Sequence, residues 1–322
     1  MIRYLLRRLL QAVLLLVAVS VLLFGLMQTA PGDYLSEQRL TGQLSPESLR
    51  ALRAQYGLDQ PLAVRYARWL VSVGKGEFGY SFAYNVPASQ LLLPRVRNTL
   101  LLTLPALFLS WLIGVPAGVL AASRRGGWFD RLFSGGNTLL LALPDVLLGL
   151  VALFIALRTH IFPAGGMTSM DLNDATAMAR IPDLLWHLAL PVSVLVLGSL
   201  APIMLHVRSS VAEVMESSYF RAAEGHGLRR FRLLFCHALP AAANPLISLF
   251  GLSFAFLLST SLVVEVILSW PGIGPMLLEA VLARDLFVVL GAAIFSTIFL
   301  VAGNLVADIL LYAFDPRIRV QS

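Results

Sequence analysis

The chain has 322 residues, of which 58% are hydrophobic and only 13% are charged, and its mean hydropathy is +0.79. Because soluble domains carry about 25% charged residues, this composition excludes an ordinary soluble protein and indicates a chain solvated mainly by lipid. The net charge of +6 does not predict a nucleic-acid partner, since the arginines cluster in the gaps between apolar runs, where they orient membrane proteins.

The first apolar segment, residues 9–29, is long enough to cross a membrane, because a bilayer core needs about 20 apolar residues per helix. Its apolar run, 9–27, exceeds the roughly 7–15 residues of the apolar region of a signal peptide. Thr29-Ala30-Pro31 is also a poor cleavage site, with proline directly after the small residue. We therefore predict that residues 1–30 form an N-terminal tip and a retained first span.

Residues 31–98 follow as a segment that contains two helix signals. Ser45-Pro46-Glu47 is typical of a helix start, with serine as N-cap and proline in the first turn, and Gly57 would end that helix. We predict a small extracytoplasmic helical cap, which either receives a soluble delivery protein or covers the outer mouth as a packed loop. The second helix would start at Asp59-Gln60-Pro61 and carry an apolar stripe at Leu62, Tyr66, Trp69, Leu70 and Val73.

Five further segments are apolar and long enough to span a bilayer. Helix-breaking prolines occur within several of them, and membrane helices tolerate such prolines because neighbouring helices re-satisfy the freed backbone groups. The predicted fold class is an all-α polytopic membrane protein with six transmembrane helices, in which residues 99–322 form the core domain. The five segments are 100–122, 135–157, 184–207, 246–268 and 287–312.

The arginines predict the orientation of the six spans. Thirteen lie in the terminal segments and loops of one side and three in the short loops of the other, and basic loops stay in the cytoplasm. The segment 31–98 carries eight basic residues, but it exceeds the roughly 60-residue length within which the rule counts charges. Both termini are therefore predicted to be cytoplasmic. The thirteen are Arg3, Arg7, Arg8, Arg124, Arg125, Arg131, Arg208, Arg221, Arg229, Arg230, Arg232, Arg317 and Arg319; the three are Arg158, Arg180 and Arg284.

Several ionisable or amide side chains lie at membrane depth within the predicted spans. A charged side chain near the bilayer centre costs about 2.5–3.5 kcal/mol on insertion scales, so such residues usually face protein, water or a substrate pathway. Asp145 is the best candidate to line a pathway, and Asn137 and Gly149 would lie near the same helical face. Glu265 is a further candidate near a span end, whereas we assign Asp308 a structural role.

Residues 217–227 form a short polar island of small side chains between two long apolar segments, on the predicted cytoplasmic side. Ala222 and Ala223 would let a partner approach closely, and Phe220 offers one apolar anchor. Two glycines end the island and apolar residues then resume at helical spacing, which predicts a helix, a turn and a second helix. From these residues alone, docking of a soluble partner and an ordinary basic loop attracted to anionic lipid are equally supported.

Sequence motifs for several enzymatic chemistries are absent. The single lysine, Lys75, is not in a Gly-Lys-Ser/Thr sequence, so the chain has no P-loop with which to bind nucleotide phosphates. The five histidines do not form the zinc-protease pattern, and no serine lies in a Gly-x-Ser-x-Gly setting. The only cysteine, Cys236, excludes a disulfide within the chain and cysteine-based metal sites. We expect no catalytic residue and no metal site.

Short motifs occur along nearly the full chain in a specific order and spacing. The first are Arg7-Arg8-Leu9-Leu10, Ala30-Pro31-Gly32-Asp33, Tyr56-Gly57-Leu58-Asp59-Gln60-Pro61-Leu62 and Phe78-Gly79-Tyr80-Ser81-Phe82. The later ones are Gly114-Val115-Pro116-Ala117-Gly118, Asp130-Arg131, Arg221-Ala222-Ala223, Trp270-Pro271-Gly272-Ile273-Gly274, Ala283-Arg284-Asp285 and Asp315-Pro316-Arg317-Ile318-Arg319. Together they resemble the permeases of the dipeptide, oligopeptide and nickel ABC-importer family.

This resemblance implies the type I ABC-importer permease fold in a bacterial inner membrane, with no cofactor in this subunit. It further implies a second homologous permease, two ATP-binding subunits that hold ATP and magnesium, and an extracytoplasmic substrate-binding protein, in addition to membrane lipid. The cytoplasmic loop 208–243 would couple to the ATPases through residues 217–240. The coupling residues that the resemblance implies are Phe220, Arg221, Ala222, Ala223, Glu224, Gly227, Leu239 and Pro240.

Peptides are the substrate that the resemblance favours, with nickel or another small solute as the alternative. No metal-ligand constellation argues for nickel, but an importer need not chelate what its delivery protein has bound. Asp145 follows Pro144 where a small neutral residue is common in the family, which would make the pathway more acidic than usual. A secondary transporter that uses no ATP is a second alternative, although no internal repeat typical of that class is evident.

Overall fold

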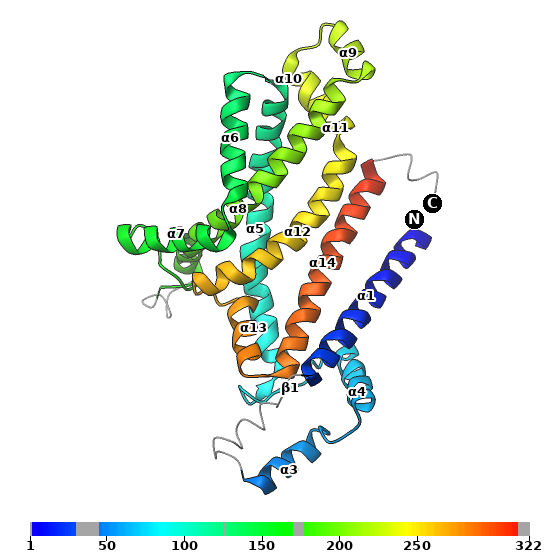
Figure 1. Cartoon of the computed structure of the whole chain (residues 1–322), viewed down its shortest axis with the longest axis vertical. Coiled ribbons are helices and arrows are strands. Elements are labelled where there is room, and N and C mark those ends of the chain that lie inside the picture. The colour runs from blue at the N-terminus through cyan, green and yellow to red at the C-terminus, as the bar shows by residue number, and fades with distance from the viewer. Residues whose placement is uncertain (1, 30–44, 125, 170–176, 315–322) are drawn as a thin grey trace. The chain divides into compact units, whose positions relative to one another are not determined.

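The structure, a computed structural model, describes residues 2–29, 45–124, 126–169 and 177–314. These residues are mainly helical, and one antiparallel two-stranded sheet accompanies the helices (Figure 1). Within them, five helices are long and apolar enough to cross a membrane, and a bent helix pair supplies a sixth, broken span. The motifs that begin at Ala30 and at Asp315 lie outside the described residues.

The chain divides into two compact units, each of which is described by itself. The α8 unit contains Met1–Tyr4, Thr99–Trp270 and Phe299–Ser322, and the α4 unit contains Leu5–Asn98 and Pro271–Ile298. The α4 unit therefore adds residues 271–298 to the first span and to the segment predicted at 31–98.

The α8 unit is built around α8 (Ala177–Met215), which contacts α6 (Trp128–Ala142), α7 (Asp145–Thr159) and α12 (Ala243–Ile267). Leu195, Leu257 and Trp270 are fully buried in its main apolar core. The remaining elements of the unit are most of α5 (Ala88–Ser123), α9 (Ser218–Gly225), α10 (Arg230–Arg232), the π-helix η2 (Leu233–Ala238), α11 (Leu239–Ala241) and the last part of α14 (Leu286–Phe314).

Helices α5 and α8 pack with their backbones close together because a small residue lies at the contact. A Cβ atom at Gly118 would lie 2.7 Å from Val207 Cβ, so a larger residue would push α5 away from α8. Further along the same two helices, the buried hydroxyls of Ser110 and Ser199 are 2.6 Å apart. Small residues and serine pairs are typical of helix contacts in membranes, where lipid tails give no hydrophobic driving force for association.

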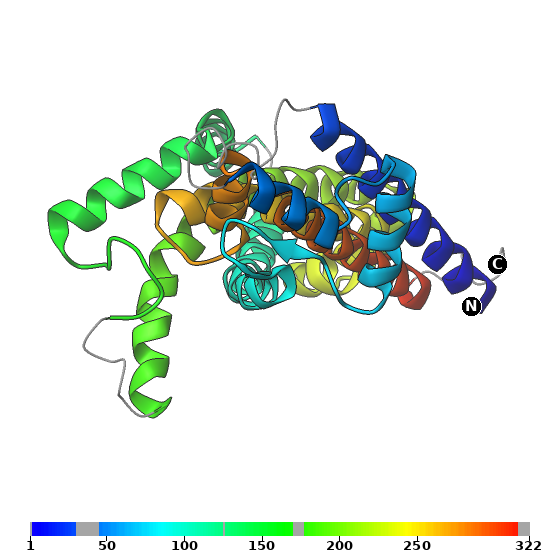
Figure 2. The ribbon, with the colours of Figure 1, turned by 90° about the horizontal axis from the view of Figure 1, so that it is seen from below.

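The third predicted span, 135–157, is a broken helix pair, so the six predicted spans are five continuous helices and one bent pair. Helix α6 ends at Ala142, α7 begins at Asp145, and their axes are bent by 94° (Figures 1 and 2). Pro144 causes the break, because a proline pushes the residue before it out of the helical region and donates no backbone hydrogen bond. Leu143 accordingly has extended dihedral angles, with φ −86° and ψ 118°.

The α4 unit contains most of the first span, α1 (Ile2–Thr29), and confirms the two helices predicted after it. Ser45 caps α3 (Pro46–Gln55) by accepting a hydrogen bond from the Ser48 amide at 3.1 Å, and Gly57 follows with φ +64°. The second helix is α4 (Leu62–Gly74). The unit also contains β1 (Tyr80–Ser81), β2 (Val86–Pro87), α13 (Ile273–Leu282), the first part of α5 and the first part of α14.

Helix α4 is held against the C-terminal part of α1 by one hydrogen bond and by aromatic contacts. The hydroxyl groups of Ser20 and Tyr66 are 2.9 Å apart, and the rings of Phe24 and Tyr66 meet edge to face at 5.5 Å. Trp69 is buried and donates from Nε1 to the Phe78 carbonyl at 3.1 Å. The predicted apolar stripe is therefore buried at its centre, whereas its flanking residue Leu62 remains 43% exposed.

Asp285 joins the sheet region of the α4 unit to the start of α14. Its Oδ2 accepts hydrogen bonds from Ser81 Oγ at 2.5 Å and from the Ala83 amide at 3.2 Å. The backbone amides of Phe287 and Val288, at the start of α14, also act to lower its pKa. Burial nevertheless outweighs these bonds and raises the pKa of Asp285 above the usual aspartate range.

We predict that Asp285→Asn flattens the pH dependence of folding stability. Since the folded-state pKa is raised, the contribution of Asp285 to stability is fully present below its unfolded-state pKa and is lost as pH rises through the folded-state pKa. Thermal unfolding of the purified protein in detergent between pH 4 and pH 8 measures this. The difference in stability between wild type and variant should grow in favour of the variant as pH rises.

The matched control is Asp59→Asn, since Asp59 is an exposed carboxylate of the same unit. Asp285→Ala, which removes both bonds to the sheet region, should destabilise the protein by about 1–3 kcal/mol at every pH. If the plot of stability against pH for Asp285→Asn stays parallel to that of wild type, the proposed effect of burial is refuted.

Candidate functional site

The polar island contains the predicted short helix, α9, and the structure explains both of its ends. Ser217 is the N-cap, since its Oγ accepts a hydrogen bond from the Phe220 amide at 3.3 Å and donates to the Val214 carbonyl at 2.6 Å. After the helix, Gly227 adopts φ +74°, a left-handed conformation that favours glycine. The helix-and-turn prediction is therefore confirmed, and Gly227 has a backbone role in it.

Phe220 anchors α9 to its own chain. It is 5% exposed and belongs to a buried cluster with Val211 of α8 and with Leu233 and Leu234 of η2. The expectation that Phe220 offers an apolar anchor to a partner is corrected by this burial, because little of its side chain is available at the surface. Ala223 packs partly buried against the same cluster.

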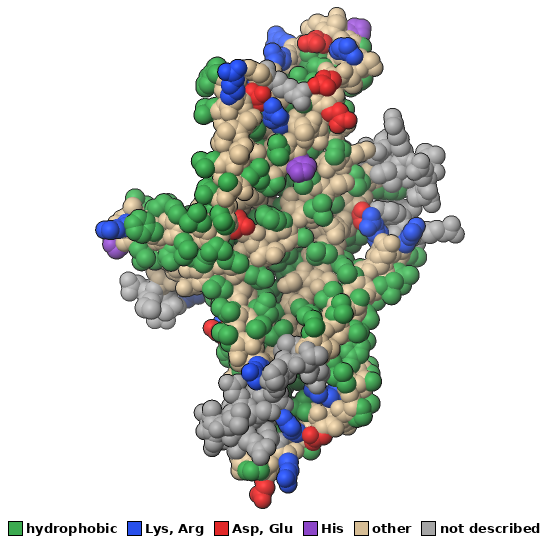
Figure 3. All heavy atoms as spheres, viewed as in Figure 1, with side chains coloured by type: hydrophobic (Ala, Val, Ile, Leu, Met, Phe, Trp, Pro, Cys, Tyr) green, Lys and Arg blue, Asp and Glu red, His purple; other side chains and the backbone are tan. Residues whose placement is uncertain are grey.

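The other side chains of α9 are mostly polar and open. Arg221, Ala222 and Glu224 are exposed, and the neighbouring Tyr219 is 54% exposed. Charged side chains gather around this helix on the face shown in Figure 3, whereas hydrophobic side chains cover the surface of α7. A small side chain near a cation and a carboxylate suits a close contact with another polar surface.

The second predicted helix of the island is present, but its central part is a π-helix, η2. The amide of Leu239 bonds to the Leu234 carbonyl, five residues earlier, and Leu239 is half-buried. Pro240 is exposed at the start of α11, where the missing N–H of proline is tolerated. His237 of η2 approaches the Tyr219 hydroxyl at 3.3 Å through Nδ1, so η2 also contacts α9. π-Helices are rare and occur frequently at functional sites.

Two arginines connect this region to the ends of α5 and α6. Arg230 donates from Nη2 to the carbonyl of Ser123, the last residue of α5. Arg208 of α8 forms a two-pronged pair with Asp130 of α6, with Nε–Oδ1 and Nη2–Oδ2 distances of 2.9 and 3.0 Å. The sequence analysis did not predict either contact. The only signal was that Asp130 and Arg208 both lie on the predicted cytoplasmic side.

Asp145, the first pathway candidate, is the first residue of α7 and lies at the break of the third span. Its Oδ2 accepts a 3.4 Å hydrogen bond from Thr260 of α12, and a Cβ atom at Gly198 of α8 would collide with its Oδ1. Half-buried Asp145 thus lies against α8 and α12. Gly149, also on α7, faces Ile267 of α12, whose Cδ1 would be 3.1 Å from an added Cβ atom.

Asn137 and Glu265 have other surroundings. The expectation that Asn137 shares a helical face with Asp145 is wrong, because the helix breaks after Ala142 and its periodicity does not continue to Asp145. Asn137 lines a cavity of about 380 Å³ between α6 and α8, together with Leu132, Phe133, Gly136, Leu140 and Met204. Its Oδ1 accepts no hydrogen bond from any described residue. Glu265, near the end of α12, is fully buried.

These features define a polytopic helical membrane protein with one broken span and a polar surface helix anchored to its core. Residues 114–320 match the family described as "Binding-protein-dependent transport system inner membrane component", and residues 1–103 match the corresponding N-terminal family. The chain belongs to this family and is a permease subunit of an ABC importer, as the resemblance predicted.

Several relatives match over nearly their full length. A putative peptide permease protein of Brucella suis is 36% identical over 323 residues, which are 99% of this chain and 100% of the relative. The oligopeptide transport system permease protein AppB of Bacillus subtilis is 34% identical, covering 98% and 99% of the two chains. The dipeptide transport system permease protein DppB of Escherichia coli K12 is 31% identical, covering 99% of both chains.

A solved structure supports the fold. A chain of the MetNI methionine ABC transporter, in an inward-facing conformation, superposes with a TM-score of 0.55 over 70% of this chain and 97% of that chain. Their sequence identity is 17%, so the likeness concerns the fold alone. The predicted type I importer fold is confirmed, with a broken helix pair in place of the third continuous span.

We predict that Arg208 and Asp130 stabilise the protein as a pair. Arg208→Gln and Asp130→Asn should each destabilise it. A double-mutant cycle should give a coupling free energy of about 1–2 kcal/mol, because charge-assisted hydrogen bonds in a partly buried site stabilise a protein more than exposed ion pairs do. Unfolding in detergent measures all four proteins. Arg131→Gln, which changes the exposed neighbouring arginine, should alter stability by less than about 0.5 kcal/mol. Additive effects of the two single variants would show that the pair contributes nothing.

Proposed function

We propose that this chain forms half of the translocation pathway of an ATP-driven peptide importer, and that α9 couples it to ATPase subunits. The observation that carries the coupling role is the two-sided character of α9. Phe220 is buried in a cluster with α8 and η2, whereas Arg221, Ala222 and Glu224 are exposed. A partner that moves the exposed face of α9 therefore moves the core behind it.

Peptides are the substrate that the relatives favour, since three of them carry peptide, oligopeptide or dipeptide in their names. Nickel or another small solute is the alternative within the same class of transporter. Asp145, Asn137 and Glu265 are our candidates for the pathway. Asp145 is the strongest of them, because it is only half-buried and lies at the break between two helices.

The partners follow from the same class of importer. We infer a second homologous permease, two ATP-binding subunits that supply ATP and magnesium chemistry, and an extracytoplasmic substrate-binding protein. The excess of arginines on one side supports cytoplasmic N- and C-termini. On this orientation α9 lies in the cytoplasm with the ATPases, and the α3 and α4 segment lies outside with the binding protein.

Two contacts would carry motion from the region of α9 to other helices of the α8 unit. Arg230, which follows α9 by a few residues, bonds to the C-terminal end of α5. Arg208 of α8 holds Asp130, close to the start of α6. ATP-driven closure of the ATPases would push on α9. Helices α5, α6 and α8 would then shift together as packed bodies rather than deform. Small shifts at one site become larger movements in this way.

We predict that Ala222→Asp and Arg221→Glu uncouple ATP hydrolysis from transport. Each puts a wrong charge on the exposed face of α9 without touching Phe220, and an unpaired charge at an interface costs several kcal/mol. The measurement is peptide-stimulated ATPase activity and uptake of labelled peptide in vesicles that contain the reconstituted permeases, ATPases and binding protein. Both activities should fall by about tenfold or more.

The control is Ala51→Asp, which adds the same charge to an exposed position of α3 and should leave coupling unchanged. Gly227 is a poorer test position, because any side chain there also strains a backbone with φ +74°. Normal coupling in both α9 variants would remove α9 from the interface. Uptake that needs no ATP would favour a secondary transporter, and stimulation by a nickel-loaded but not a peptide-loaded binding protein would favour the alternative substrate.

A further inference from the structure

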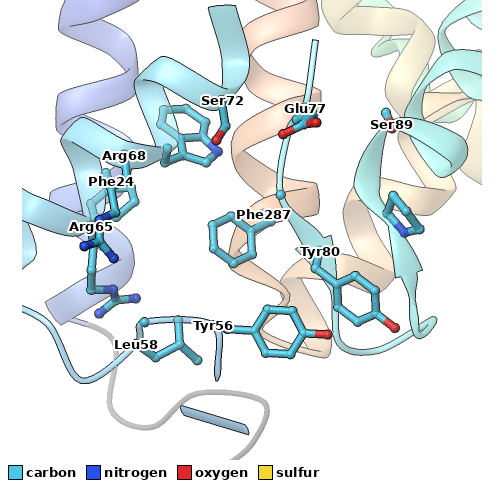
Figure 4. Close-up of a pocket in the computed structure, with 14 residues that line it drawn as sticks. Phe24, Tyr56, Leu58, Arg65, Arg68, Ser72, Glu77, Tyr80, Ser89 and Phe287 are labelled. Atoms are coloured by element: carbon cyan, nitrogen blue, oxygen red, sulfur yellow. The ribbon is translucent and has the colours of Figure 1, made fainter. Parts of the chain in front are cut away.

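A pocket of about 390 Å³ lies within the α4 unit, and its lining includes neither a residue of α9 nor a pathway candidate. Pockets that hold small ligands usually have about 300–1,000 Å³, so its size suits one headgroup or small molecule. Figure 4 shows its walls. The lining includes two arginines, one glutamate and several aromatic rings: Arg65, Arg68, Glu77, Phe24, Tyr56, Trp69, Tyr80 and Phe287.

The pocket contains a cationic side and an acidic side. Arg65 and Arg68 are three residues apart on α4 and so extend from one helical face. They lie on the same side of the pocket in Figure 4, and Glu77, from the loop after α4, lies on another side. A ligand with an anionic group and a cationic group would therefore find a partner for each.

Neighbouring residues show where the guanidinium groups of the two arginines lie. The Arg65 guanidinium stacks over the Phe24 ring, with Cζ 5.8 Å from the ring centroid. Arg68 Nη1 lies 3.5 Å from the position that a Cβ atom would take at Gly57. Guanidinium groups match the oxygens of a phosphate with two parallel hydrogen bonds, which a single ammonium group cannot do.

The depth of the pocket in the membrane follows from α1. The first span covers Leu6–Leu26, so Phe24 lies at its end, where lipid headgroups begin. Tyr66 and Trp69 of α4 pack against Phe24 at the same level, as the amphipathic rings of membrane-interface belts do. Leu22 and Leu26 of α1 are 65% and 63% exposed, on the face of the helix turned away from Phe24, and offer an apolar surface for acyl chains.

We propose that this pocket binds the headgroup of a zwitterionic phospholipid that carries a phosphate and a primary ammonium group, such as phosphatidylethanolamine. Arg65 and Arg68 bind the phosphate, and Glu77 together with the faces of the tyrosine rings binds the ammonium group. The acyl chains run along the exposed leucines of α1. The lipid thereby holds α4 at the membrane surface. This site is independent of the coupling role proposed for α9.

The test uses the full chain, purified in detergent, depleted of lipid and then exposed to equal amounts of phosphatidylethanolamine, phosphatidylglycerol and phosphatidylcholine. Native mass spectrometry counts the lipids that remain bound. Wild type should retain one phosphatidylethanolamine per chain in preference to the other two. Arg65→Gln combined with Arg68→Gln should reduce this retention by about tenfold or more, because it removes the charge-assisted bonds to the phosphate.

Two further variants sharpen the result. Arg50→Gln combined with Lys75→Gln removes the same charge from exposed positions that do not line the pocket, and should retain the lipid as wild type does. Glu77→Gln keeps both arginines but removes the acceptor of the ammonium group, so the preference should shift from phosphatidylethanolamine to phosphatidylglycerol. Since Glu77 is exposed, this variant remains informative even where the double arginine variant fails to fold.

Three outcomes would overturn the proposal. Equal retention by wild type and the double arginine variant would remove the pocket as the lipid site. An unchanged headgroup preference in Glu77→Gln would remove the role of the ammonium group. Displacement of the lipid by an equal concentration of O-phosphoethanolamine, which has no acyl chains, would assign the pocket to a water-soluble zwitterion instead.

Discussion

The lack of water in the bilayer core is the constraint on which the rest of this structure depends, because every backbone group there must be paired within the protein. At the break between α6 and α7 no continuous helix pairs the backbone groups, so they need other partners. The Leu143 amide bonds back to Leu140 at 3.3 Å, and the Pro144 carbonyl accepts from Leu148 at 3.1 Å. Helices α8 and α12 cover the start of α7, and a carboxylate, Asp145, is tolerable there because it is packed against protein.

The same constraint explains why small residues decide how the helices of the α8 unit pack. Lipid tails are as apolar as leucine side chains, so helices gain by close approach rather than by leaving water. Gly118 lets α5 reach Val207 of α8, and Gly303 of α14 lets Phe254 of α12 approach within 2.7 Å of an added Cβ position. Close-packed interfaces of this kind shift as bodies and deform little, which suits a unit that must transmit motion.

Features with local causes could be predicted from the sequence. The serine cap of α3, the turn at Gly57 and the extent of α9 all follow from a few adjacent residues whose dihedral preferences and side-chain bonds determine them. Features that depend on distant residues could not. The burial of Phe220 needs α8 and η2 to be in place, and the pair of Asp130 and Arg208 joins residues 78 positions apart. Pro144 was visible in sequence, but whether a membrane proline bends a helix or breaks it depends on its neighbours.

The placement of Phe220 changes what α9 can do at an interface. A surface helix that offered its one large apolar side chain to a partner would bind more tightly but would be held less firmly by its own chain. Here the apolar contact is internal, and Tyr219 adds a contact to His237 of η2. The exposed face presents Arg221 and Glu224, three residues apart, and charged contacts contribute orientation and rate of association more than affinity. On the proposed function, α9 therefore serves to transmit force, and much of the affinity for the ATPases must come from surfaces beyond α9.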